Sequence, residues 1–160
     1  MEKAPARVYA DTSVFGGVFD KEFTTASESF FEQARQRSFQ LVVSDVIRKE
    51  IADAPQPVRA LFDEMLVAAE IAEITADALR LRQAYIDAHI LSPKWSDDAL
   101  HVALATVSGC AMIVSWNFKH IVHYQKIPLY NAVNTLQGYG NIFIYSPLEV
   151  MGYGDQDEEL

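Results

Sequence analysis

Short apolar runs of strand length alternate along the chain with longer segments whose apolar residues recur at helical spacing. The strand-like runs cover residues 7–10, 39–44, 112–116 and 142–145, and the first is followed by a predicted loop around Gly16 and Gly17. Helical spacing predicts helices over 25–37, 45–52, 58–71, 75–90, from Asp97 onward, and over 128–137. Strands that alternate with helices are typical of a three-layer α/β/α fold with a central, mainly parallel sheet.

The alternation continues without an internal repeat, a low-complexity tract or a linker, so we expect a single domain over residues 1–150. Residues 151–160 include the acidic sequence DQDEEL and are expected to form a disordered tail. Residues 99–118 carry no formal charge and are long enough to cross a bilayer. They contain polar side chains, however, and divide at Ser108–Gly109 into a helical and a β-rich half. We therefore expect a buried helix followed by a buried strand, and no membrane span.

Composition narrows the class of protein. Half of the residues are hydrophobic and 22% are charged, which is ordinary for a globular protein. The single cysteine, Cys110, excludes an internal disulfide and a four-cysteine zinc site. The first residues include no apolar segment typical of a secretory signal, so we expect a cytoplasmic protein.

Charge is unevenly distributed along the chain. The net charge of −9 repels nucleic acid on average, so RNA binding would need a local basic face. Residues 99–148 contain no Asp or Glu, although they include Lys119, Lys126 and three histidines. The segment NFKHIVHYQK (117–126) is a candidate for such a face, and a solvated loop is an equal alternative.

Four polar residues are predicted to meet at one edge of the sheet. Asp11 directly follows the first strand, and Asn117 follows the strand 112–116. Glu50 lies in the helix after the second strand, and Asp98 lies in the first turn of a helix, where a carboxylate is favoured. Ligands of parallel sheets gather at the carboxyl ends of the strands, and oxygen ligands without His or Cys select Mg²⁺ or Mn²⁺. Taken singly, each acid also has a structural alternative as a turn cap, a solvated carboxylate or a first-turn residue.

Four motifs, in order, resemble those of the PIN-domain family, particularly VapC-type toxins. They are YADTSVF around Asp11, SDVIRKEI with Glu50, SDDALHVALA with Asp98, and IVSWNFKHI with Asn117 in the fourth acidic position. The segment LYNAVNTLQGYGNIFIYSPLE also resembles the C-terminal helix and strand of the family. The resemblance covers residues 7–149.

This resemblance implies a PIN fold and a metal-dependent endoribonuclease. Asp11, Glu50 and Asp98 would hold Mg²⁺ or Mn²⁺, with Asn117 completing the site. Hydrolysis of the RNA phosphodiester would leave a 5′-phosphate and a 3′-hydroxyl. The resemblance further implies the toxin of a type II toxin–antitoxin pair, with an antitoxin protein as a partner. It also implies a homodimer, which the apolar helices 58–71 and 75–90 would suit.

Two departures from the family pattern keep alternatives open. Asn117 removes one negative charge, which leaves room for a catalytically weak PIN scaffold that acts by binding RNA or a protein partner. The doublet Asp97–Asp98 allows two registers, and we favour Asp98 because it lies three residues before His101. His101 is interpreted as a satisfied helix histidine and His120 as a surface or RNA-facing residue. Receiver domains and haloacid-dehalogenase phosphatases are excluded, because the sequence around Asp11 has neither an acidic pair nor Asp-x-Asp.

Overall fold

A five-stranded parallel sheet forms the centre of the molecule. The computed structural model describes residues 4–151, and the predicted tail beyond residue 151 lies outside them. The sheet has the order β3-β2-β1-β4-β5, so the first strand in the sequence is central. The strands are β1 (Arg7–Ala10), β2 (Gln40–Ser44), β3 (Glu70–Ala72), β4 (Met112–Val114) and β5 (Phe143–Tyr145). All four strand pairs are parallel, which confirms the predicted α/β/α architecture.

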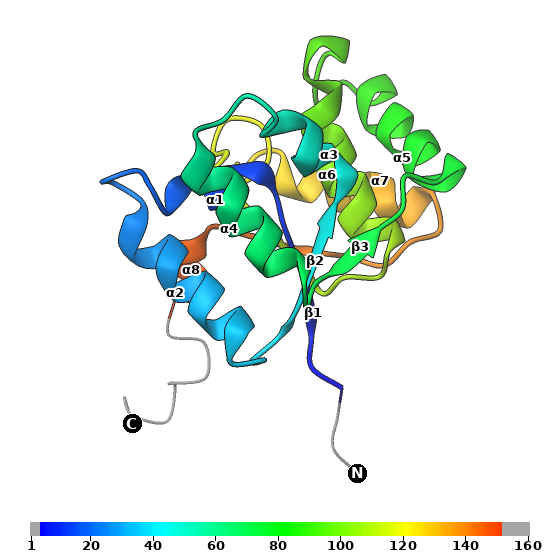
Figure 1. Cartoon of the computed structure of the whole chain (residues 1–160). Helices are drawn as coiled ribbons and strands as arrows, with labels where there is room; N and C mark the ends of the chain where they lie inside the picture. Colours follow the sequence, from blue (N-terminus) through cyan, green and yellow to red (C-terminus); the bar gives the residue numbers. More distant parts are fainter. Residues whose placement is uncertain (1–3, 152–160) are drawn as a thin grey trace.

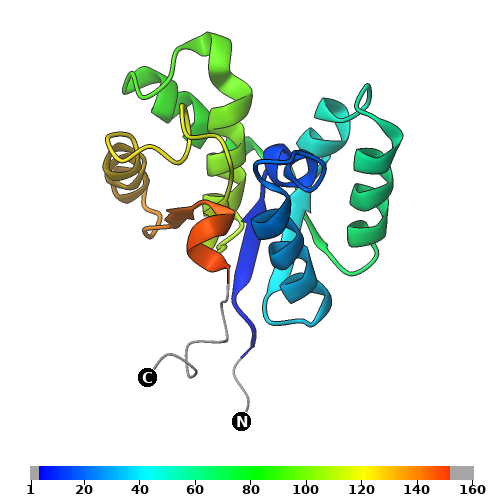
Figure 2. The same cartoon turned by 90° about the vertical axis from the view of Figure 1, so that its left-hand side faces the viewer.

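Helices cover both faces of the sheet, as the two views in Figures 1 and 2 show. One face packs against α1 (Thr12–Gly17), α2 (Thr24–Arg35), α4 (Gln56–Leu66) and α8 (Pro147–Val150). The other face packs against α5 (Ala76–Asp87), α6 (Ser96–Val107) and α7 (Ile127–Leu136). The short α3 (Asp45–Glu50) follows β2 and contributes to both cores, and the 3₁₀ turn η1 (Pro93–Trp95) precedes α6.

Alternate side chains of the central strand enter opposite cores. Tyr9 belongs to the core beneath α5, α6 and α7, whereas Val8 and Ala10 belong to the core beneath α1, α2 and α4. Because β1 is buried on both faces, it is apolar almost throughout. The uncharged stretch 99–118 is confirmed as a buried helix, α6, followed by the strand β4. Within residues 4–151, no helix is long and apolar enough to cross a membrane.

Two sequence-based expectations about secondary structure were wrong. The helix expected over 58–71 ends at Leu66, and Glu70–Ala72 form the edge strand β3. Only Ala72 of this strand is buried, so its side chains lack the apolar pattern of a central strand. The expected loop around Gly16 and Gly17 is instead the short helix α1.

Gly17 allows the close approach of α1 to its neighbours. A Cβ atom there would lie 2.5 Å from Ser27 Oγ and 2.6 Å from Trp116 Nε1. These two atoms are joined by a 2.8 Å hydrogen bond, and Trp116 stacks on Phe23 with ring centroids 4.1 Å apart. The glycine therefore fixes α1, and the residues at its start, against the segment that follows β4.

Candidate active site

Asp11 is a buried carboxylate at the end of the central strand. It is the N-cap of α1, and its backbone N–H donates to Val114 O across 3.2 Å. Its Oδ1 accepts from the Ser13 hydroxyl at 2.6 Å and from the Ser13 backbone N–H at 3.1 Å. The Ser115 hydroxyl donates to Oδ2 at 2.7 Å. Burial raises the pKa of Asp11 although the charge of His101 and these hydrogen bonds oppose the shift.

Glu50 is held by one hydroxyl and one imidazole. Thr12 Oγ1 donates to Glu50 Oε1 at 2.7 Å, and His101 Nε2 lies 2.5 Å from the same oxygen. Burial alone would raise the pKa of Glu50, but the hydrogen bonds and charge of His101, together with Thr12, lower it below its ordinary value. Glu50 is thus an anchored carboxylate, and its Oε2 forms no hydrogen bond with any described residue.

His101 is the centre of a buried polar network. Its side chain is 2% exposed, and its Nδ1 lies 2.7 Å from the Tyr9 hydroxyl, which lies 2.7 Å from Ser44 Oγ. Burial alone would lower the pKa of His101. The hydrogen bond to Glu50 and the charges of Asp11, Glu50 and Asp98 raise it above its ordinary value. The expectation of a satisfied helix histidine is confirmed, and the same side chain forms a hydrogen bond with Glu50, one of the three predicted carboxylates.

Asp98 is paired with a second imidazole. His120 Nδ1 lies 2.8 Å from Asp98 Oδ2, and because a carboxylate oxygen accepts, Nδ1 carries the hydrogen. Asp97 is exposed and forms no hydrogen bond within the part of the chain that the structure describes. The buried position of His120 corrects its interpretation as a surface histidine.

Asn117 shapes the turn that carries His120. Its Oδ1 accepts from the His120 backbone N–H at 2.9 Å, and its own N–H donates to Ser115 Oγ at 2.9 Å. Asn117 therefore connects two parts of the site. Its backbone N–H binds Ser115, which contacts Asp11, and its side-chain oxygen binds the backbone of His120, which contacts Asp98. Its direct role at a metal stays a prediction.

The donor atoms suit a divalent cation, but they do not form a ready-made metal site. Within residues 4–151, no three His, Cys, Asp or Glu side chains are arranged to hold a metal ion. Glu50 and Asp98 each form a hydrogen bond with an imidazole through one oxygen, and within that same part of the chain their second oxygens accept no hydrogen bond. Carboxylate oxygens of this kind are the ligands that Mg²⁺ and Mn²⁺ prefer. The donor chemistry therefore fits such an ion, provided that the free oxygens turn toward it.

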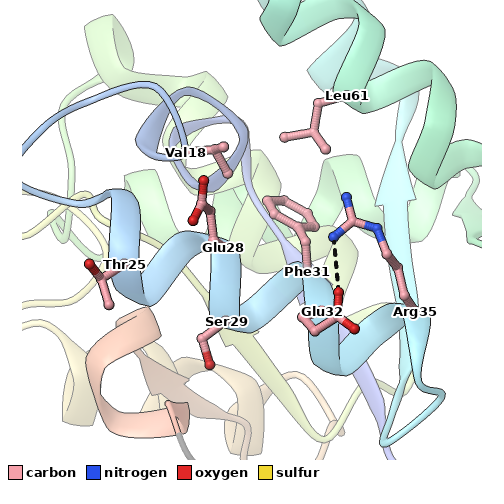
Figure 3. A pocket seen from close by; sticks show the side chains of 8 residues that line it. All are labelled: Val18, Thr25, Glu28, Ser29, Phe31, Glu32, Arg35 and Leu61. Atoms are coloured by element: carbon pink, nitrogen blue, oxygen red, sulfur yellow. Dashed lines mark ion pairs between the residues drawn. The ribbon is translucent and has the colours of Figure 1, made fainter.

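A hollow of about 770 Å³ opens beside Glu50. Thr12, Ser13 and Glu50 line it, together with residues of α1, of α4 and of the segments next to them. A second hollow of about 500 Å³ lies between α2 and α4 and includes none of the candidate site residues (Figure 3). It is lined by Val18, Thr25, Glu28, Ser29, Phe31, Glu32, Arg35 and Leu61. Only the first hollow adjoins groups that could act on a bound ligand.

Sequence reasoning missed several members of the polar network. Ser115 and Tyr9 are buried and bridge residues far apart in the sequence, and no spacing along the chain indicates such bridges. A weak signal existed for Ser115, because it directly follows β4 at the same sheet edge as Asp11. His120 had no such signal, since it lies in a turn and its partner Asp98 lies in the helix α6, 22 residues earlier in the sequence.

Comparison with known proteins adds a family and a fold. The family model described as PIN domain matches residues 7–119. No curated protein matches the chain significantly. Among solved structures, a chain in the crystal structure of VapBC2 from Rickettsia felis bound to a promoter DNA fragment matches with a TM-score of 0.58 and 14% identity. The match covers 88% of this chain and 98% of the other.

Proposed function

Because the chain belongs to the PIN-domain family, we propose that it is a metal-dependent endoribonuclease and the toxin of a type II toxin–antitoxin pair. The observation that carries this proposal is the hydrogen bond between Glu50 and the buried His101, whose pKa the charges of Asp11 and Asp98 also raise. Asp11 lies at the carboxyl edge of the sheet, directly after β1. Such an edge is where parallel α/β sheets bind their ligands.

In this proposal Asp11, Glu50 and Asp98 hold Mg²⁺ or Mn²⁺, and Asn117 supports the site. A bound divalent cation would activate water and offset the charge of the transferring phosphoryl group. The protein's own residues orient the ligands. Ser13 and Ser115 fix both oxygens of Asp11, and the two imidazoles hold one oxygen each of Glu50 and Asp98. The products would be a 5′-phosphate and a 3′-hydroxyl.

The partners proposed are RNA, an antitoxin protein and a second copy of the chain. The solved VapBC2 structure, a complex bound to its promoter DNA, supports the antitoxin as a class of partner.

The expected dimer would use α4, α5 and the segment that joins them, where Val67 is 89% exposed and Leu79 38% exposed. Light scattering that gives a monomer at micromolar concentration would contradict the dimer. The proposed location is the cytoplasm, where RNA is present.

The test is cleavage of a panel of structured and single-stranded RNAs by the purified protein. Mg²⁺ or Mn²⁺ should support cleavage and a chelator should stop it. Asp11→Asn and Asp98→Asn should each lower the rate by about 100-fold or more, because loss of a metal ligand costs at least as much as loss of its supporting residues. Asp97→Asn is the matched control and should cleave like the wild type. Cleavage by Asp11→Asn at the wild-type rate would assign the activity to a contaminant or another site.

The alternative is a PIN scaffold that binds RNA or a partner with little turnover. The pairing of Glu50 and Asp98 with imidazoles, and the amide at position 117, favour it. Wild-type protein that binds RNA but cleaves no member of the panel with either metal would establish this alternative over the nuclease.

A further inference from the structure

An exposed tryptophan with two lysines lies directly beside Asp98. Trp95 ends η1 and is the N-cap residue of α6, the helix that carries Asp98. Its side chain is 36% exposed, and its ring packs against His120 with centroids 4.4 Å apart. Because His120 is also the hydrogen-bond partner of Asp98, the tryptophan is fixed relative to the candidate active site.

Two positive charges converge on this ring from different segments. Lys94 Nζ lies 5.1 Å and Lys119 Nζ 5.6 Å from the centroid of the Trp95 ring. Both lysines are exposed, and neither forms an ion pair with an acidic side chain within residues 4–151. In a chain with a net charge of −9, two lysines on one ring are a local concentration of positive charge, next to the acidic Asp97 and Asp98.

An aromatic ring flanked by mobile cations is the combination that binds single-stranded nucleic acid. Bases stack on the aromatic face, and ammonium groups on flexible stems contact the flanking phosphates. The cation–π contacts of Lys94 and Lys119 are weak at an exposed position. A base can therefore replace the ammonium groups on the ring while they move to the phosphates.

We propose that Trp95, Lys94 and Lys119 form a subsite for an unpaired nucleotide of the RNA substrate, next to the phosphate that is cleaved. This inference rests on the proposed function and deepens it. The subsite places a stacked base and two phosphate contacts beside Asp98, whereas the hollow lined by Thr12 and Glu50 includes neither Asp98 nor Trp95. It makes Trp95 a positioning residue that selects single-stranded over paired RNA.

The test measures binding separately from cleavage. A short fluorescein-labelled 2′-O-methyl RNA is titrated with protein in chelator and followed by anisotropy. The 2′-O-methyl groups protect the RNA from contaminating ribonucleases that attack through the 2′-hydroxyl, and the chelator withholds the metal that hydrolysis would need. Trp95→Leu should weaken binding about fivefold or more, because one stacked base contributes at least that factor. Trp95→Phe should retain most of the affinity. A blunt duplex of the same sequence should bind equally to wild type and Trp95→Leu.

The lysines are tested by the salt dependence of the same binding. Lys94→Gln/Lys119→Gln should lower the slope of log affinity against log salt by about 1.4, since each phosphate contact contributes about 0.7 for a single strand. The matched control is Arg59→Gln/Arg82→Gln, on α4 and α5, which removes the same charge elsewhere and should change the slope by much less. Circular dichroism and thermal unfolding confirm that each variant is folded.

The outcomes distinguish the subsite from the nuclease. If the wild type cleaves RNA and the Trp95 and lysine variants bind and cleave like it, the subsite is wrong and the proposed function stands. If the variants lose binding as expected while the wild type cleaves no RNA, the proposed subsite is supported and the proposed nuclease activity is contradicted. Equal loss in the arginine control, or no binding by the wild type at low salt, overturns the subsite.

Discussion

Asp11 and Glu50 are carboxylates at the same edge of the sheet, yet their surroundings shift their pKa values in opposite directions. Burial raises the pKa of both. At Glu50 the imidazole of His101 and the hydroxyl of Thr12 outweigh burial, whereas at Asp11 the hydroxyls of Ser13 and Ser115 and the charge of His101 do not. An imidazole that forms a hydrogen bond with the carboxylate offsets the cost of its buried charge better than neutral hydroxyls do.

The opposite pKa shifts of Asp11 and Glu50 indicate which carboxylate a bound cation would stabilise more. Ionised Glu50 already has a hydrogen-bonded imidazole that lowers its pKa. Among residues 4–151, ionised Asp11 accepts hydrogen bonds only from Ser13 and Ser115 and forms no ion pair, so a divalent ion near Asp11 would relieve the larger unfavourable energy.

Removal of the shared histidine should have the largest effect on stability. His101→Ala leaves Glu50 and the Tyr9 hydroxyl without their buried partner, and we expect a loss of about 3–5 kcal/mol in the free energy of unfolding. Chemical denaturation in chelator measures it. His123→Ala is the control, because His123 forms no ion pair within the described residues and should change stability by less than about 0.5 kcal/mol. A loss of similar size in both variants would contradict the central role of His101.

Neutralising the two carboxylates should change stability with opposite signs. In chelator, Asp11→Asn should raise the free energy of unfolding, because it removes a buried charge whose pKa is raised. Glu50→Gln should lower it by about 1–3 kcal/mol, because it removes the charged partner of His101. The same denaturation experiment on both variants decides. Stability changes of the same sign in both variants would contradict the opposite pKa shifts of Asp11 and Glu50.

The fold could be predicted because its buried elements carry strong patterns. β1, β2 and β4 are buried on both faces and appear as apolar runs, and α6 explains the long uncharged stretch. β3 could not be predicted, because two of its three side chains are exposed at the sheet edge and its sequence continues the pattern of α4. Edge strands with few buried positions have too little signal to be separated from a preceding helix.

The candidate site divides in a similar way. Asp11 and Asp98 became candidates because each lies next to an element boundary and within a motif that resembles the PIN-domain family, and their role at a metal stays a prediction. Their supporting residues could not be predicted, because hydrogen bonds such as His101–Glu50 and His120–Asp98 join separate helices and turns. These pairs depend on tertiary packing, which no local spacing specifies.

The pH dependence of stability should reveal the His101–Glu50 pair. His101 has a pKa above its ordinary value of 6.5, so its stabilising contribution is complete below pH 6.5 and is lost as pH rises through the raised pKa. In chelator, the free energy of unfolding should therefore fall above pH 6.5 by up to about 1.4 kcal/mol per pH unit for this proton. The fall should be smaller in Glu50→Gln. Equal slopes for the two proteins would contradict the pairing.

The smallest expected effect is a change in metal affinity on substitution of Asn117, which occupies the fourth acidic position of the PIN-domain motifs. Asn117→Asp adds a negative charge while its oxygen still accepts from the His120 backbone N–H. Mn²⁺ binding should tighten about threefold to tenfold, the effect of a charge partly screened near the surface. Titration calorimetry measures it, with Asn131→Asp on α7 as a distant control. Unchanged affinity would place residue 117 outside the reach of the metal.

The order of strands in the sheet also determines when the site is assembled. β1 is central, but its neighbour β4 comes late in the chain, and the Asp11–Ser115 bond joins residues 104 positions apart. A growing chain on the ribosome thus exposes one edge of β1 until β4 emerges, and closing so long a loop is slow. Until then Asp11 lacks Ser115, and Asp98 lacks His120. The acidic edge is therefore completed only when about three-quarters of the chain has been synthesised, so a shorter nascent fragment cannot carry the complete candidate site.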